Sequence, residues 1–218
     1  KLERERRAAL GPIEKSPARM RDEVLRSSKL QRLIKDIAGG DPQKRAETEQ
    51  RAKQMLDGLR AAPNPNAMRA FEPILDRLVR RVFSEVDVTG VEGVREASRN
   101  GTVVFLPCHK SHVDYIVLSY VLRKNLLELP VVAAGDNLSF FPVGEILRQG
   151  GAFFIRRDFR GDRLYAAVVD AYVRRLLRDG WAMEFSLEGG RSRTGKLLAP
   201  KLGLLNLVED AALSLEGR

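Results

Sequence analysis

The sequence has 218 residues, 44% of them apolar, so it can bury the core of one good-sized domain plus a smaller appendage and is too apolar to be wholly disordered. Its net charge of +9 and pI near 10.0 indicate an anionic partner: nucleic acid, an acidic membrane surface or a phosphorylated substrate. Aromatic residues make up only 6%, and no basic run is interleaved with stacking aromatics, which argues against a nucleic-acid groove.

Residues 1–65 are expected to form a helical, basic amino-terminal region. Apolar residues at helical spacing predict one helix over Asp22–Ala38, which the turn at 39–42 ends, and a second helix over Gln43–Leu59. A proline-containing linker at 61–66 follows. We interpret this region as a helical appendage with a solvated basic face. The alternative is a membrane-surface element, because a basic amphipathic helix can lie on anionic lipid.

Residues 66–218 are expected to form the main domain, which opens with a helix over Phe71–Phe83 that has Pro73 in its first turn. Short apolar runs then alternate with helical stretches. The expected strands are Thr102–Leu106, Pro130–Ala134, Ala152–Arg156 and Ala182–Leu187. The expected helices are Val113–Arg123, Gly144–Leu147, Asp162–Arg178 and Lys201–Leu215. This alternation predicts an α/β domain with a mostly parallel or mixed sheet, in which ligands bind beyond the carboxyl ends of the strands.

Cysteine content and hydropathy narrow the class further. Cys108 is the single cysteine, so neither a disulfide within the chain nor a cysteine-based zinc site can form. No segment approaches the roughly 20 apolar residues that span a bilayer. The charged run at 1–7 is not followed by an apolar stretch, as a signal peptide would require. The chain begins with Lys1, and we expect it to be a piece of a longer protein.

The first group of candidate catalytic residues is the run CHKSHVD at 108–114, which contains both histidines of the chain. His109 directly follows an expected buried strand, and Asp114 lies five positions later. If a helix begins near Ser111, the carboxylate can turn back toward the imidazole. A carboxylate on one ring nitrogen sets the tautomer, so that the other nitrogen accepts a proton. The pattern therefore predicts a general base that deprotonates a hydroxyl of the substrate.

Two other interpretations of this run stay open at the level of sequence. Ser111 or Cys108 could act as a nucleophile, although no nucleophile elbow of the G-x-S-x-G kind is present. His109, His112 and Asp114 could hold zinc, although no further histidine or cysteine exists to complete a common ligand set.

Two further groups of residues suit a bound phosphate. Arg156 and Arg157 follow the third expected strand, and an arginine fork matches the geometry of phosphate. Because successive strand side chains point to opposite faces, only one of the two arginines can readily face a given pocket. The third group is the run at 185–196 (FSLEGGRSRTGK), where glycines let backbone N–H groups approach an anion and basic side chains neutralise it. Its glycine spacing is not that of a P-loop.

Together these three groups resemble the motifs of the glycerolipid acyltransferase family. His109 and Asp114 match its H-x-x-x-x-D motif, the run 151–157 (GAFFIRR) matches its second motif, and Phe185 through Arg193 matches its third. The amino-acid sequences of these runs are most similar to those of the branch that contains the bacterial membrane glycerol-3-phosphate acyltransferases and the dihydroxyacetone-phosphate acyltransferases. The resemblance covers roughly residues 20–215.

The resemblance implies a function and roles for the matched residues. His109 would be the general base on the sn-1 hydroxyl of glycerol 3-phosphate, and Asp114 would orient it. The hydroxyl would attack acyl-CoA or acyl-carrier protein directly to give lysophosphatidic acid, with no further cofactor and no metal. Arg157 would bind the phosphate, with Arg156 as the second candidate. The remaining pocket residues would be Glu188, Gly189, Arg191, Arg193 and Lys196.

The resemblance also leaves alternatives. Dihydroxyacetone phosphate is a second candidate acceptor, and a non-catalytic fragment that binds anionic membranes is a third possibility. The family has a fourth, proline-containing motif downstream of the third, and the chain stops at Arg218 before it, so we expect the acyltransferase domain to be incomplete at its carboxyl end. The family further implies association with the cytoplasmic face of the cell membrane, without a transmembrane helix in this segment.

Overall fold

The computed structural model describes residues 12–111, 113–158, 161–192 and 194–216. Its strands form a parallel sheet in the order β1–β4–β2–β3, which confirms the predicted α/β class. The strands are β1 (Val104–Phe105), β2 (Val131–Gly135), β3 (Ala152–Ile155) and β4 (Met183–Glu184). Strands β1 and β4 are shorter than predicted, because their ladder pairs stop at Phe105 and Glu184. All carboxyl ends therefore meet at one edge of the sheet.

Side chains alternate between the two faces of this sheet. Val131, Phe153 and Met183 point into the main core and pack with helix α9 (Arg163–Asp179). Their neighbours Val132, Ala152 and Glu184 point to the opposite face and line a cavity. The three cavity-side residues are register partners, since Val132 pairs with both Ala152 and Glu184. One face of the sheet thus builds the core, and the other builds a binding site.

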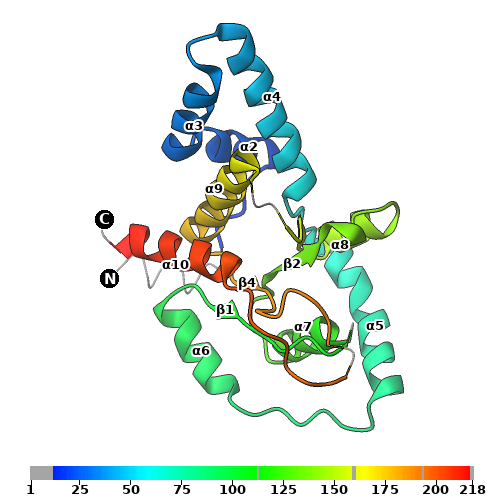
Figure 1. The fold of residues 1–218 in the computed structure, drawn as a ribbon. Helices are drawn as coiled ribbons and strands as arrows, with labels where there is room; N and C mark the ends of the chain where they lie inside the picture. The colour runs from blue at the N-terminus through cyan, green and yellow to red at the C-terminus, as the bar shows by residue number, and fades with distance from the viewer. Residues whose placement is uncertain (1–11, 112, 159–160, 193, 217–218) are drawn as a thin grey trace.

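Helices α2 (Pro17–Leu25), α3 (Ser28–Ala38) and α4 (Pro42–Leu59) gather around α9 at one end of the molecule (Figure 1). Their apolar side chains, including Leu30, Ile34 and Leu56, are fully buried in the same cluster as Val168 and Tyr172 of α9. Helix α4 begins where the Asp41 side chain accepts the N–H groups of Gln43 and Lys44, and Pro42, predicted to lie in the preceding turn, is its first residue.

The single helix predicted over Asp22–Ala38 is wrong, because the chain breaks between Leu25 and Ser28 to form α2 and α3. The Gln31 side-chain amide donates to the Leu25 carbonyl at 2.8 Å and so caps the end of α2. The break redirects the chain, so that both helices place their apolar faces against α9.

The prediction for the next segment also needs correction. Helix α5 runs over Pro65–Val82 and not from Phe71, because the Asn64 side chain accepts the N–H groups of Asn66 and Ala67 and Pro65 suits the first helical turn. Pro73 therefore lies inside the helix. The sequence also did not predict helix α6 (Val91–Asn100), whose residues are exposed or half-buried and so lack a clear apolar stripe.

The other predicted helices are confirmed within a few residues. They are α7 (Asp114–Lys124), α8 (Val143–Gln149), α9 and α10 (Gly203–Glu216), and a short 3₁₀ turn η1 (Asp136–Leu138) follows β2. Figure 1 shows α5 and α7 on the far side of the sheet from α2–α4, and α10 packs beside α9. Within the described ranges, no helix is both long and apolar enough to cross a membrane.

Candidate active site

A cavity of about 810 Å³ lies at the carboxyl edge of the sheet, a size that suits a small-molecule ligand. Charged and polar side chains reach it from three strand ends: His109 and Asp114 after β1, Arg156 and Arg157 after β3, and Arg191 after β4. Its apolar lining comes mainly from α5, β2 and α8, and includes Met68, Phe71, Leu75, Leu129, Val132 and Leu147. The predicted meeting of the three sequence groups at this edge is what the structure shows.

His109 and Asp114 form a pair at the amino terminus of α7. The Nδ1 atom of His109 is 3.5 Å from Oδ2 of Asp114, which is ion-pair range and longer than a well-formed hydrogen bond. The same Oδ2 accepts the backbone N–H groups of Lys110 and Ser111, both at 2.7 Å. Helix α7 begins at Asp114 itself, later than expected, so the carboxylate also lies at a helix amino terminus that favours its charge. Asp114 thereby stabilises the loop by hydrogen bonds and places its carboxylate beside the imidazole.

The third motif holds the main chain of His109 from two sides. The Glu188 carboxylate, only 7% exposed, accepts the backbone N–H of His109 at 3.1 Å and that of Leu198 at 3.0 Å. The Ser192 N–H donates to the His109 carbonyl at 2.9 Å. The N–H groups of Leu198 and His109 keep the pKa of the Glu188 carboxyl below its usual value. In this structure Glu188 therefore holds the backbone of His109 and does not itself line the cavity.

The two arginines after β3 differ in their partners. The Arg156 guanidinium pairs with the Asp162 carboxylate at 3.0 Å and lies over the Tyr165 ring, 4.2 Å from its centroid. The Arg157 guanidinium donates to the neutral Asn137 side-chain oxygen at 3.2 Å. Both arginines line the cavity. Because an anion must compete with Asp162 for Arg156 but with only an amide for Arg157, the geometry favours Arg157 as the phosphate ligand.

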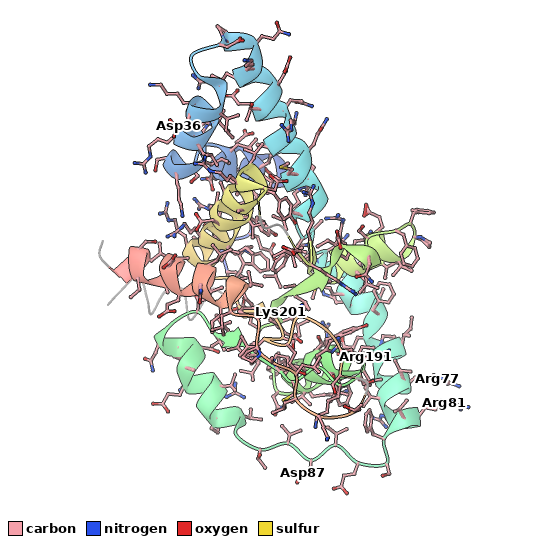
Figure 2. The ribbon with its side chains drawn as sticks, viewed as in Figure 1. Asp36, Arg77, Arg81, Asp87, Arg191 and Lys201 are labelled. Atoms are coloured by element: carbon pink, nitrogen blue, oxygen red, sulfur yellow. The ribbon has the colours of Figure 1, made fainter. Side chains whose placement is uncertain are left out.

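The glycine-rich turn after β4 lies against the start of the segment that leads to α10. Gly189 has a φ of +59°, and a Cβ on it would meet the Lys201 side chain at 2.8 Å. A glycine is required here both for the backbone conformation and for the close approach of that lysine. Gly189, Arg191 and Lys201 all line the cavity, and Figure 2 shows Arg191 and Lys201 near the centre of the molecule. Lys196 lies on an exposed segment outside the cavity lining, and Arg193 lies outside the described residues.

Sequence reasoning missed several cavity residues, of which Glu184 stands out. Its side chain is 2% exposed, and its Oε2 atom has no hydrogen-bond partner among the described residues. Burial raises the pKa of this carboxyl to about 7. The available signal was a charged residue in the middle of the apolar run 182–187. Asn137 and Lys201 were also missed, because neither belongs to a recognisable motif.

The structure also bears on the alternatives left open by the sequence. The Ser111 hydroxyl accepts the Val113 N–H at 3.2 Å, so it stabilises the turn before α7. Cys108 is exposed and lines the cavity beside His109. His112 lies outside the described residues. Within the described part of the chain, no three His, Cys, Asp or Glu side chains are grouped as metal ligands.

Comparison with known proteins identifies the family to which this chain belongs. The acyltransferase family model matches residues 85–215, which is more than half of the chain and includes every strand of the sheet. The chain belongs to the acyltransferase family. The matched residues contain the His109–Asp114 pair, both arginines after β3 and the Glu188 turn. The elements that surround the cavity are therefore largely those of an acyltransferase domain.

Curated relatives of this acyltransferase domain extend the similarity to almost the whole chain. A glycerol-3-phosphate acyltransferase of Shewanella oneidensis is 37% identical over 211 residues, which are 96% of this chain and 26% of the relative. Proteins of the same name from Histophilus somni and Pasteurella multocida are each 39% identical, over 95% and 96% of this chain respectively, and again over 26% of their own length. The chain thus spans about a quarter of the length of the curated relatives it matches.

Proposed function

We propose that this chain carries the catalytic centre of a glycerol-3-phosphate 1-O-acyltransferase. The observation that supports it best is the placement of a His–Asp pair and a phosphate-suited arginine in one cavity with an apolar lining. Relatives named glycerol-3-phosphate acyltransferase share 37% and 39% identity with it. The acyl donor is acyl-CoA or acyl-carrier protein, and the product is lysophosphatidic acid.

The reaction follows from these side chains. Asp114 faces Nδ1 of His109, so Nε2 is the nitrogen that accepts the proton of the sn-1 hydroxyl. The hydroxyl oxygen attacks the thioester carbonyl carbon and forms the ester bond, and the carbon–sulfur bond breaks with departure of the thiolate. The proton on His109 then neutralises that thiolate. This scheme has no acyl-enzyme and needs no cofactor beyond the thioester.

The cavity lining divides the substrate between two environments. Arg157 binds the phosphate, and Arg191 and Lys201 add positive charge to the cavity lining. The apolar side chains from α5 and β2 suit the acyl chain. The Glu188 carboxylate keeps the His109 backbone in place while these groups bind. Membrane association at the cytoplasmic face is part of this proposal, since the product is a lipid and thioester donors are cytoplasmic.

The test is acyl transfer from a radiolabelled thioester to glycerol 3-phosphate, in the longest form of the protein that contains this sequence. Replacing His109 with alanine is expected to lower kcat by about 10²–10⁴-fold, the usual contribution of a general base. Cys108→Ala is the matched control, because it alters the adjacent cavity residue and removes the candidate nucleophile. Activity that survives H109A would contradict the general-base role, and activity that disappears with C108A would contradict the direct transfer. Dihydroxyacetone phosphate is assayed in parallel to identify the preferred acceptor.

A further inference from the structure

Helix α5 carries an apolar stripe on its outer surface. Phe71, Ile74, Leu78 and Val82 are spaced three and four residues apart, so they lie along one face of the helix. Their exposed fractions are 39%, 61%, 40% and 54%. Such a continuous stripe on a surface helix marks an interaction site, whereas single exposed apolar residues do not.

The acids of α5 lie away from its apolar stripe, and two of its arginines lie next to it. Both acids of the helix turn toward α7, where Glu72 pairs with Arg123 at 2.7 Å and Asp76 pairs with Lys124 at 2.8 Å. Of the exposed arginines of this helix, Arg77 and Arg81 lie beside the apolar stripe, three residues after Ile74 and Leu78, whereas the arginines at 69 and 80 lie on the face of the two acids. Figure 2 shows that two of these arginines, at 77 and 81, point away from the body of the molecule. The outer surface of α5 therefore combines apolar and cationic groups, and its anionic groups are neutralised on the inner face.

The amino-terminal helices do not offer a comparable surface. Leu30 and Ile34 of α3, and Ala52 and Leu56 of α4, are buried against the core. The apolar faces that the sequence assigned to a possible membrane-surface element are thus already covered by protein. Compared with α3 and α4, helix α5 carries the longer row of exposed apolar side chains, and its stripe is left uncovered by the other described residues.

The same helix forms a wall of the active-site cavity. Met68, Phe71 and Leu75 line the cavity, and Phe71 also begins the outer stripe. A surface that contacts lipid through this stripe would therefore lie directly next to the space proposed for the acyl chain. This arrangement shortens the path between the reacting groups and a bilayer.

We propose that α5 docks this chain on an anionic lipid bilayer, with the stripe at the acyl boundary and the flanking arginines at the headgroups. The cation–apolar pattern is that of an interfacial helix, and charge complementarity favours anionic lipid over a second copy of this basic chain. The proposal rests on the proposed function only in that a lipid product would leave the site next to the bilayer. Docking itself needs no catalysis.

The experiment measures partitioning of the chain onto vesicles by co-sedimentation. Vesicles of phosphatidylcholine alone are compared with vesicles containing about 30% phosphatidylglycerol. Replacing both Arg77 and Arg81 with glutamine is expected to lower the partition coefficient about 25-fold, since each arginine near the surface contributes about fivefold. Replacing both Ile74 and Leu78 with serine is expected to lower the partition coefficient by about tenfold or more, because it removes apolar contact with the lipid.

The matched control replaces Lys44 and Arg51 with glutamine, because both are exposed on α4 and their loss removes the same charge. It is expected to change partitioning less than about threefold. Equal losses in the two glutamine variants, or no preference for anionic vesicles, would overturn the proposal. So would a dimer that the serine variant dissociates, because a second copy would then cover the stripe. Turnover in detergent micelles should survive both α5 variants, which separates failure of docking from failure of the proposed function.

Discussion

Replacing Arg157 or Arg156 with alanine should separate phosphate binding from fold stability. Arg157 contacts a neutral amide, whereas Arg156 is held by the Asp162 carboxylate and the Tyr165 ring. A charge-assisted hydrogen bond to an anion is worth about 1.5–3 kcal/mol. The Arg157 side chain is exposed to solvent, which screens its charge. We therefore expect its contribution to phosphate binding to be about 2 kcal/mol, in the lower part of that range.

At about 1.4 kcal/mol per tenfold, that energy corresponds to a rise of about 30-fold in the KM for glycerol 3-phosphate in R157A. R156A instead loses a surface ion pair, worth about 0–1 kcal/mol, and a cation–π contact of about 0.5–1 kcal/mol. We therefore expect R156A to lower Tm by about 2–4 °C and to change KM less than about threefold.

The assay is initial-rate acyl transfer at a saturating thioester concentration with glycerol 3-phosphate varied, and each variant is also melted thermally. R157A should change KM and leave Tm near the wild-type value, and R156A should do the reverse. The reasoning is refuted if R156A raises KM strongly while R157A does not, because that result would make the acid-paired arginine the phosphate ligand.

Three further variants test the surroundings of the site. E184Q should flatten the dependence of the unfolding free energy on pH. The pKa of Glu184 is about 7 in the folded chain, so from pH 4.5 upward this carboxyl ionises more readily in the unfolded chain, which costs the wild type up to about 3 kcal/mol of stability by pH 7. Parallel curves of stability against pH for the two proteins would contradict this. If Arg157 is the phosphate ligand as proposed, G135A should raise the KM for the phosphorylated acceptor several-fold with little change in Tm. A Cβ at position 135 would lie 2.6 Å from the Asn137 oxygen that accepts from the Arg157 guanidinium, and an unchanged KM would argue against that positioning. Y172F should cost about 1–3 kcal/mol in chemical denaturation, because the buried Tyr172 hydroxyl accepts the Ala61 N–H at 2.9 Å, and a loss below about 0.5 kcal/mol would show that water replaces it.

Local patterns in the sequence were sufficient for the class of fold and for the edge of the sheet that carries the site. Runs such as 131–135 and 152–155 are short, apolar and separated by helices, which favours a parallel sheet. Parallel strands bring their carboxyl ends to one edge, so motifs that follow different strands had to meet there. His109, Arg157 and Gly189 could be placed together on that ground alone, without knowledge of the strand order.

Helix boundaries were less predictable where the controlling contact is not a hydrophobic pattern. The break before Ser28 depends on how two helix faces meet α9, and the start of α5 depends on the Asn64 cap, seven residues before the expected start at Phe71. Helix α6 has no buried stripe, so periodicity could not reveal it. Of these, only the break before Ser28 was decided by tertiary packing, because the cap of α5 is made by residues adjacent in the chain.

The sequence by itself determined the α/β alternation, the His109–Asp114 spacing and the presence of phosphate-suited arginines, because each is set by residues close together in the chain. Tertiary structure alone decided that Glu188 holds the backbone of His109 and that the Tyr172 hydroxyl accepts the Ala61 N–H. These are contacts between distant segments: Glu188 and His109 are 79 residues apart, and Tyr172 and Ala61 are 111 apart. Strand order and helix packing bring such groups together, and no local pattern encodes either.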